Sequence, residues 1–379
     1  MIRATVVDRT PHARMNGVAR YMMGLASHAD SGGNSLDLRI LSWGREVPAG
    51  RWLATFDPAR RPSNFATRLN RRFLRPWGQS LSRADVIHYP YHYLPPGWAR
   101  GRAAKIVTVH GASAYAAELW DPERGDRIRS GLRSGAAALA QVVTVSQWSK
   151  DELVRHYELP PGQITVIPNG VDLSRFQGGE PLPGSEDADR KGAQSPPYLL
   201  HVGPCEPRKN LPRLVRAFGL LRQRLDLPHR LVLAGSPGRD TRELRALVSS
   251  LGLEQAVELT GPVSDARLVR LYRGAELFVF PSLYEGFGIP VLEAMACGVP
   301  VVTSNCTALP EVAGGAAMLV DDPNSPECIA QACEVALADV KVRADMIRRG
   351  LDHVQSYTWR NCAEAHFALY SRCGQQAPD

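Results

Sequence analysis

The sequence has few features of a membrane-spanning or secreted protein. Its 379 residues contain no run of eighteen or more apolar residues, which is about the minimum for a transmembrane helix. The first eight residues follow a strand pattern and lack the basic stretch, apolar core and cleavage site of a signal peptide. We therefore expect a cytoplasmic protein with no membrane-spanning segment.

Cysteine is missing from the N-terminal half. The cysteines of the C-terminal half are odd in number, and none forms a Cys-x-x-Cys pair or a Cys/His spacing typical of zinc sites. We expect buried free thiols in a reducing compartment rather than disulfides or structural zinc. The seven cysteines are Cys205, Cys297, Cys306, Cys328, Cys333, Cys362 and Cys373.

The chain is too long for one ordinary hydrophobic core and has the composition of a globular protein, which favours two domains. One stretch, 177–197, is rich in Gly, Pro, Ser and acidic residues and has no hydrophobic period, as expected of a linker. We place an N-terminal domain at 1–177, a linker at 178–197 and a C-terminal domain at 198–355. A last helix within 356–379 is expected to pack back on the N-terminal domain.

Short β-branched runs alternate with helix-like stretches along both halves. This alternation predicts an α/β fold with two Rossmann-like, doubly wound parallel sheets. Such sheets bind ligands at the carboxyl ends of their strands, and two of them facing across a cleft would hold a ligand there. The expected strands are 3–8, 37–42, 85–89, 104–110, 141–146 and 163–168, then 198–203, 230–235, 256–260, 277–281 and 299–304.

The segment 281–310 carries the strongest chemical signal. After a strand, a glycine-rich turn contains Glu285, and Glu293 follows eight positions later in a predicted helix. Gly286 and Gly288 allow a ligand to approach the backbone, and the free N–H groups of a helix N-terminus suit a diphosphate. A carboxylate accepts two hydroxyl hydrogen bonds in a fixed plane, which suits a sugar.

This segment closely resembles the E-x7-E segment of retaining glycosyltransferases with the GT-B fold, in particular the large family 4 group. Residues 201–210 (HVGPCEPRKN) resemble the family's phosphate-binding loop, and 167–172 (IPNGVD) resemble the segment that closes the N-terminal domain. Residues 231–235 and 145–149 match a strand and a serine-containing turn of the same family. The resemblance implies the GT-B architecture and a nucleoside diphosphate sugar as the donor.

The resemblance implies roles for the phosphate-binding loop. Arg208 and Lys209 would neutralise the donor's diphosphate and stabilise the charge of the leaving group. Gly203 and Glu206 lie in the same loop and would also bind the donor. Family members often have an arginine directly after the first glycine, where this chain has Pro204. More of the phosphate binding therefore falls to Arg208 and Lys209.

The E-x7-E segment supplies the remaining donor contacts implied by the resemblance. Glu285 would hold hydroxyl groups of the transferred sugar, and Glu293 would hold the ribose of the nucleotide. The backbone amides after Glu285 would meet the sugar and the phosphates, and these residues are Gly286, Phe287, Gly288 and Ile289.

Two positions of the N-terminal half join this site by resemblance. Gly17 lies at a helix start where the family often has a glycine pair, and would let the backbone pass close to the diphosphate and acceptor. A simple turn before a capped helix is the competing interpretation. His110 ends a strand, and in similar enzymes a histidine there contacts the donor sugar. Taken alone, a strand-end histidine is more often structural.

No Asp-x-Asp metal motif lies in a convincing loop, so we expect neither a metal ion nor another cofactor. The similar enzymes retain the anomeric configuration by a same-face route in which the leaving phosphate takes the acceptor's proton. In that mechanism Glu285 binds and orients the sugar and is no general base. His110, Glu285, Arg208 and Lys209 are the expected catalytic residues.

The net charge of +7 favours anionic partners, and much of it lies in one segment, 60–77. Apolar residues recur there every fourth position with arginines between them, as in a helix that lies on an anionic membrane surface. An ordinary amphipathic helix facing the core is the alternative. No nucleic-acid-binding module is visible, so no nucleic-acid partner is expected. The apolar residues are Phe65, Leu69, Phe73 and Trp77, and the arginines are Arg68, Arg71, Arg72 and Arg75.

The expected activity is transfer of one sugar to a glycan or polyprenyl-linked acceptor, at the inner face of the plasma membrane if the 60–77 helix meets it. Two stretches, GVARY near the start and EPRKNL later, look most like bacterial mannosyltransferases of surface-polysaccharide assembly. GDP-mannose is therefore the first expected donor. The alternatives are a UDP-sugar-dependent transferase with another acceptor, a nucleotide-sugar 2-epimerase of the same architecture, and a non-catalytic sugar-binding relative.

Overall fold

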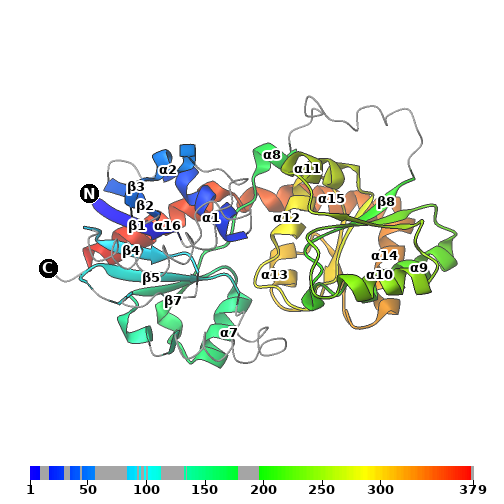
Figure 1. The fold of residues 1–379 in the computed structure, drawn as a ribbon, viewed down its shortest axis with the longest axis horizontal. Coiled ribbons are helices and arrows are strands. Elements are labelled where there is room, and N and C mark those ends of the chain that lie inside the picture. Colours follow the sequence, from blue (N-terminus) through cyan, green and yellow to red (C-terminus); the bar gives the residue numbers. More distant parts are fainter. Residues whose placement is uncertain are drawn as a thin grey trace. The chain divides into compact units, whose positions relative to one another are not determined.

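The structure is a computed structural model of the whole chain (Figure 1). It describes residues 1–8, 17–29, 35–42, 45–55, 83–91, 94, 98–99, 101–111, 132–133, 135–177 and 196–376. The chain divides into two compact units. Unit 1 comprises Met1–Gly170 and Thr358–Asp379, and unit 2 comprises Val171–Tyr357.

Unit 1 is built on a sheet whose described strands follow the order β3-β2-β1-β4-β5-β6-β7. All neighbours pair in parallel except β2 and β3. The central strands are rich in Val and Ile and are buried, as expected of parallel strands covered on both faces. The bounds are β1 Ile2–Val7, β2 Leu36–Ser42, β3 Arg45–Pro48, β4 Val86–Tyr89, β5 Ala104–Val109, β6 Gln141–Thr144 and β7 Ile164–Val166.

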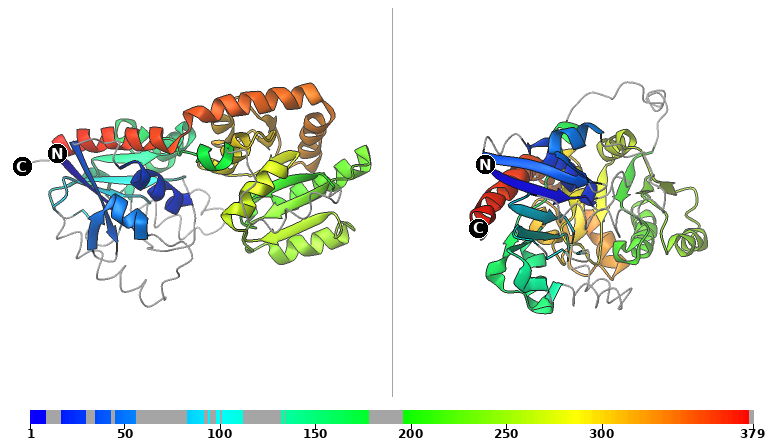
Figure 2. Two further views of the ribbon diagram at one scale, coloured as in Figure 1. Left: turned by 90° about the horizontal axis from the view of Figure 1, so that it is seen from above. Right: turned by 60° about the vertical axis from the view of Figure 1, so that its left-hand side comes forward.

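Helices cover both faces of this sheet. On one face, α1 (Gly17–Ser27), α2 (Ala49–Thr55) and α16 (Trp359–Gln375) share a hydrophobic core with β1, β2 and β4. On the other face, α7 (Gln147–Tyr157) packs with the short helix Ala136–Ala138 and the second core. Figure 2 shows α16, in red, running along the sheet of the N-terminal strands. The last helix of the sequence is thus part of unit 1.

Unit 2 contains a second sheet, whose described strands follow the order β10-β9-β8-β11-β12-β13. Every pairing in it is parallel. This is the 3-2-1-4-5-6 order of the doubly wound fold, which reverses direction between β8 and β11. The bounds are β8 Tyr198–Val202, β9 Arg230–Ala234, β10 Val257–Gly261, β11 Leu277–Phe280, β12 Val301–Ser304 and β13 Met318–Val320.

The helices of unit 2 also lie on both faces of its sheet. On one face, α9 (Leu211–Leu225), α10 (Thr241–Ser250) and α14 (Pro326–Ala338) form the main hydrophobic core. The other helices are α8 Leu173–Gln177, α11 Asp265–Gly274, α12 Ile289–Ala296, α13 Leu309–Ala313 and α15 Val340–His353, with short 3-10 helices at Pro207–Lys209 and Val354–Ser356.

The observed division corrects the expected domain bounds at one point. The chain leaves unit 1 after Gly170, not after 177, because α8 belongs to unit 2. Arg175 of α8 pairs with Asp265 across 2.9 Å, and the ring of Phe176 packs edge-on against Tyr272. The second change of unit, after Tyr357, lies two residues beyond the expected 355.

Two strands were not predicted, β3 and β13. The first is a short, exposed edge strand ending in proline, and the second has only three residues, so neither has a hydrophobic pattern. The segment 60–77 and most of the expected linker, 178–195, lie outside the described residues. Within the described part of the chain, no helix is both long and apolar enough to cross a bilayer. All seven cysteines are free thiols.

Candidate active site

The polar residues of unit 2 gather where two neighbouring strands end. The loop after β8 carries Arg208 and Lys209, and the loop after β11 carries Glu285. These two strands flank the point at which the strand order reverses, which is where doubly wound sheets bind ligands. The Leu283 N–H donates to the Arg208 carbonyl across 2.8 Å and ties the loops together.

Four charged side chains form one ion cluster in these loops. Lys209 Nζ and Arg208 Nη1 both donate to the same atom, Glu285 Oε1, across 2.6 and 2.8 Å. Arg208 Nε also donates to Glu206 Oε2 across 3.0 Å. The predicted residues Glu206, Arg208, Lys209 and Glu285 are therefore brought together. The cluster therefore combines two cationic hydrogen-bond donors, Arg208 and Lys209, with a carboxylate acceptor, Glu285, whose position they fix.

The cluster sets the charge of its members. Burial alone would raise the pKa of Glu285, but Lys209 and Arg208 hold that pKa below its ordinary value, so the carboxylate is ionised. Burial lowers the pKa of Lys209 to about 8, and the pull of Glu285 only partly opposes this. Arg208 stays charged, because its guanidinium keeps its proton at any relevant pH. Lys209 is therefore the cation that titrates near neutrality.

The Lys209 side chain lies beside Phe280, Gly203 and His201. Its ammonium is 4.4 Å from the centroid of the Phe280 ring. A Cβ on Gly203 would lie 3.1 Å from Lys209 Cε and 3.2 Å from His201 Nε2, so a side chain there would crowd the lysine. His201 donates from Nδ1 to the Val279 carbonyl across 3.0 Å and stacks on Phe280. Sequence reasoning included Gly203 but gave no role to His201, the first residue of the phosphate-binding motif, or to Phe280, the last residue of β11.

The turn that carries Glu285 is shaped by a glycine. Gly288, the residue before α12, has φ of +124°, a conformation that side chains disfavour. A Cβ there would also lie 2.9 Å from Leu309 Cδ2. The predicted residues Gly286 and Phe287 precede it, and Ile289 is the first residue of α12. Phe287 itself is buried against Tyr357.

Glu293 accepts a hydrogen bond from a tyrosine on α11. It lies on α12 with only 2 % of its surface exposed, and its Oε2 accepts from the Tyr272 hydroxyl across 2.9 Å. Every residue from Val291 to Ala296 is buried, and Ile289 and Pro290 at the start of the helix are half-buried. Sequence reasoning did not find Tyr272, which lies on α11 and has no motif around it.

Two predicted residues lie in unit 1, not in unit 2. Gly17 is the first residue of α1. His110 directly follows β5, and its Nε2 lies 3.0 Å from the Pro90 carbonyl, which can only accept, so Nε2 carries the hydrogen. Burial lowers the pKa of His110 to about 4, so the ring is neutral and its Nδ1 is an acceptor.

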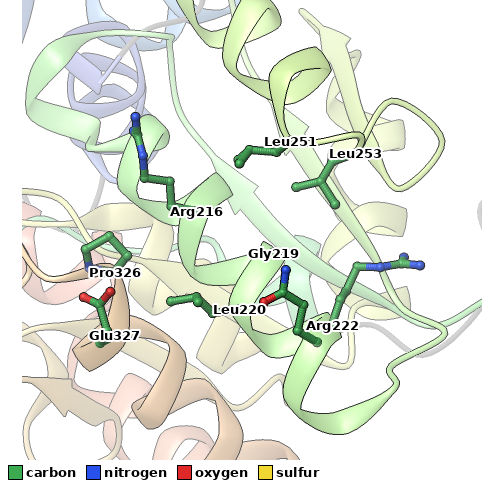
Figure 3. Close-up of a pocket in the computed structure, with 9 residues that line it drawn as sticks. Arg216, Gly219, Leu220, Arg222, Leu251, Leu253, Pro326 and Glu327 are labelled. Atoms are coloured by element: carbon green, nitrogen blue, oxygen red, sulfur yellow. The ribbon is translucent and has the colours of Figure 1, made fainter.

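Two hollows in unit 2 differ in their relation to the cluster. A surface hollow of about 490 Å³ lies over α9, near the first residues of α14 (Figure 3). Its lining includes Arg216 and Glu327 but no residue of the ion cluster. A smaller one of about 40 Å³ is lined by Gly203, Cys205 and Gly235 and is too small for a sugar nucleotide. Among the described residues, no group of three or more His, Cys, Asp or Glu side chains could hold a metal ion.

Two family matches cover most of the chain. Residues 15–175 match Glycosyltransferase Family 4, and residues 185–353 match Glycosyl transferases group 1. The chain is 35% identical over 308 residues to O-antigen chain mannosyltransferase B of Escherichia coli, covering 79% of this chain and 78% of that one. It is 30% identical over 352 residues to a D-inositol 3-phosphate glycosyltransferase of Saccharomonospora viridis, covering 86% and 78%.

The fold has a matching counterpart among solved structures. Sucrose-phosphate synthase from Thermosynechococcus elongatus aligns with a TM-score of 0.76 at 20% identity, covering 99% of this chain and 100% of that one. The α/β fold with two parallel sheets is thus the GT-B fold that the sequence motifs predicted. With the loops of the E-x7-E segment and the phosphate-binding motif placed as described, the chain belongs to the group 1, or family 4, glycosyltransferases.

Proposed function

We propose that this glycosyltransferase is a retaining, metal-independent hexosyltransferase that takes mannose from GDP-mannose. The observation that carries the proposal is the pairing of Arg208 and Lys209 on one oxygen of Glu285, at the strand ends where doubly wound sheets bind ligands. Two cations suited to a diphosphate, beside a carboxylate suited to sugar hydroxyls, support this function.

The two cations take the role that a divalent ion has in other transferases. When the bond between the anomeric carbon and the diphosphate breaks, negative charge develops on the leaving phosphate oxygens. Arg208 and Lys209 stabilise that charge in a site largely shielded from water. Glu285 is ionised and cannot donate a proton, so it accepts hydrogen bonds from sugar hydroxyls and orients the ring.

No side chain is required as a nucleophile in the proposed route. The leaving phosphate takes the proton of the acceptor hydroxyl on the same face of the sugar, and the anomeric configuration is retained. His110, which is neutral and has an acceptor at Nδ1, accepts a hydrogen bond from the donor sugar. Glu293, oriented by the Tyr272 hydroxyl, holds the ribose, and Gly17 lets the α1 backbone approach the diphosphate.

The choice of mannose and of the acceptor rests on the relatives. The relative that is 35% identical is named as a mannosyltransferase of the O-antigen chain, which supports a polysaccharide or polyprenyl-linked acceptor. The relative named for D-inositol 3-phosphate supports the alternative, a transferase with another donor and a small acceptor. Donor identity separates the two.

We also propose that the segment 60–77 meets the anionic inner face of the plasma membrane. Its support is the sequence pattern of arginines beside an apolar stripe. Replacing Arg68, Arg71, Arg72 and Arg75 by glutamine should abolish co-flotation with vesicles rich in anionic lipid. Co-flotation that survives the replacement would count against the membrane contact.

The test of the donor assignment is a panel of GDP- and UDP-sugars with and without EDTA. We expect GDP-mannose to raise Tm and to be hydrolysed slowly, with no effect of EDTA. Lys209→Ala should lose the stabilisation, whereas Arg216→Ala, an exposed cation of the same unit, should keep it. Proton NMR of the product reads its anomeric configuration. Stabilisation by a UDP-sugar alone, loss with EDTA, or an inverted product would each contradict one part of the proposal.

A further inference from the structure

A line of polar side chains runs through the interior of unit 1 and joins α16 to α1 and to the central strands. Tyr21, His88, Thr108, His366 and Tyr370 are all fully buried. Their polar atoms are linked in sequence: Tyr370 to His88 across 2.6 Å, His88 to Thr108 across 2.7 Å, Thr108 to Tyr21 across 3.1 Å, and Tyr21 to His366 across 2.6 Å.

One carbonyl fixes the direction of these hydrogen bonds. His366 Nδ1 lies 2.8 Å from the Cys362 carbonyl oxygen, which can only accept, so Nδ1 carries the hydrogen. Burial lowers the pKa of His366 to about 4, so the ring is neutral and its Nε2 is bare. The Tyr21 hydroxyl must therefore donate to His366 Nε2. The hydroxyl hydrogen of Tyr21 is therefore used in the bond to α16 and cannot be donated to Thr108.

The rest of the line follows from that bond. Thr108 has to donate to the Tyr21 oxygen, because the hydrogen of Tyr21 points to His366. His88 Nε2 then donates to Thr108, and burial keeps His88 neutral by lowering its pKa, so His88 Nδ1 accepts from Tyr370. Each buried hydrogen along the line has one acceptor. Such a fully satisfied network holds its members in one arrangement.

One member of this line, Tyr21, packs against His110. The rings of Tyr21 and His110 meet edge-on, with centroids 4.7 Å apart and an angle of 83° between their planes. The Pro90 carbonyl holds His110 Nε2 from another direction. The His110 imidazole is therefore held by its hydrogen bond to Pro90 and by the ring of Tyr21. The hydroxyl of Tyr21 is in turn bonded to His366 on α16.

We propose that Tyr21 is a positioning residue for His110, and that His366 of α16 sets the place of Tyr21. The proposal rests on the role proposed above for His110 in contacting the donor sugar. The alternative is a polar core that only stabilises unit 1. The two differ in one respect: a positioning residue acts on transfer only while His110 is present.

The kinetic test is a double-mutant cycle of Tyr21→Leu and His110→Ala, measured with the full chain and the donor found in the panel. Tyr21→Leu should lower kcat about tenfold and change the donor KM less than threefold, because small misplacements of a contact act on the transition state. In the His110→Ala background it should have no further effect on kcat. An equal loss in both backgrounds would overturn the proposal.

Two further variants separate positioning from folding. Tyr21→Phe keeps the ring but frees it from His366, so it should lower kcat in the same direction as Tyr21→Leu. Tyr157→Phe removes a phenol oxygen from another buried tyrosine of unit 1 and should leave kcat unchanged. A fall in kcat that merely follows the fall in Tm across all three variants would count against positioning.

An activity-independent readout covers the case in which His110 has no role in transfer. In a long-range ¹H–¹⁵N spectrum of ¹⁵N-histidine protein, His110 should show a protonated Nε2 and a bare Nδ1. Tyr21→Leu should shift and broaden these His110 signals, whereas Tyr157→Phe should not. If the signals shift but His110→Ala leaves kcat unchanged, the proposed role of His110 fails while the structural coupling stands. If they do not shift, Tyr21 does not position His110.

Discussion

Lys209 donates to Glu285 Oε1 across 2.6 Å, and their side chains are only 5% and 11% exposed. Removing two opposite charges from water costs free energy that their attraction must offset. The pair therefore depends on both partners and on Arg208 beside it, and a bound diphosphate would change the balance. Three of the expectations below follow from the surroundings of this pair.

Donor capture should weaken as pH rises through about 8. Burial lowers the pKa of Lys209 to about 8, so above that pH the free enzyme loses the ammonium that a diphosphate needs. We expect kcat/KM for the donor to fall about tenfold per pH unit above 8, since this ratio reports the ionisation of the free enzyme.

Lys209→Arg is the matched variant for this pH profile. Its guanidinium remains charged, so the fall above pH 8 should disappear even where the absolute rate is lower. A basic limb that is unchanged in Lys209→Arg would assign the ionisation to another group.

Glu285→Gln should have opposite effects on transfer and on nucleotide binding. The variant leaves the buried Lys209 without its anion and Arg208 with Glu206 alone, so the free energy of unfolding should fall by about 3 kcal/mol. Calorimetry should nevertheless show tighter binding of GDP, because its diphosphate no longer competes with the carboxylate. Transfer should fall at least about a hundredfold, because the sugar hydroxyls lose an ionic acceptor.

The control for Glu285→Gln is Glu258→Gln, which breaks half-exposed ion pairs with Arg230 and Arg267 in the same unit. In this control we expect the free energy of unfolding to change by less than about 1 kcal/mol and GDP to bind as in the unmodified protein. Weaker GDP binding in Glu285→Gln would mean that the carboxylate helps to bind the nucleotide rather than competing with its phosphates.

Gly235→Ala should raise the donor KM at least about tenfold. A Cβ on Gly235 would lie 1.8 Å from the Gly203 carbonyl oxygen, so the loop after β8, which carries Lys209, would have to move. Gly219→Ala is the control, because its Cβ would lie 3.6 Å from Leu253 and needs no movement of the loop. The donor KM should stay unchanged, and the free energy of unfolding should rise by about 0.5–1 kcal/mol, because alanine favours a helix over glycine. An unchanged KM in Gly235→Ala would show that the loop adapts.

Stability should fall as pH is lowered from about 6.5 toward 4. His110 and His366 stay neutral in the folded protein down to about pH 4, whereas the unfolded chain binds those protons near pH 6.5. Each such histidine then lowers the free energy of unfolding by about 1.4 kcal/mol per pH unit within this window, and by nothing above it. Urea titrations at pH 7.5, 6.0 and 5.0 measure the slope, which should be shallower in His366→Gln. Parallel slopes would refute the assignment.

Much of the fold and part of the site could be predicted from sequence, because both depend on local patterns. The β-branched runs that predicted the strands are buried on both faces of parallel sheets, and their bounds agree within two residues. Arg208, Lys209 and Glu285 lie in loops that directly follow such strands. Because β8 and β11 are neighbours in the parallel sheet, those loops meet at the same edge of it.

The rest depends on contacts that leave no local pattern. Tyr21 and His366 are 345 residues apart, and nothing near either residue indicates the other. The direction of Glu293 could not be predicted either, because α12 is buried from Val291 to Ala296 and has no apolar stripe to set its phase. The edge strand β3 has four residues, two of them charged and one a proline, so its sequence resembles a turn.

The membership of α16 in unit 1 has a consequence for the order in which the protein is made. Synthesis runs from the N-terminus, and domains generally fold as they emerge. The sheet of unit 1 emerges first. Its core lacks α16, which carries the hydrogen-bond partner of Tyr21, until the residues after Tyr357 have been added. Unit 2, made later, is complete earlier. The nascent β1, β2 and β4 must therefore wait with part of an apolar face uncovered, and released chains truncated after Tyr357 should carry a folded unit 2 and an unfinished unit 1.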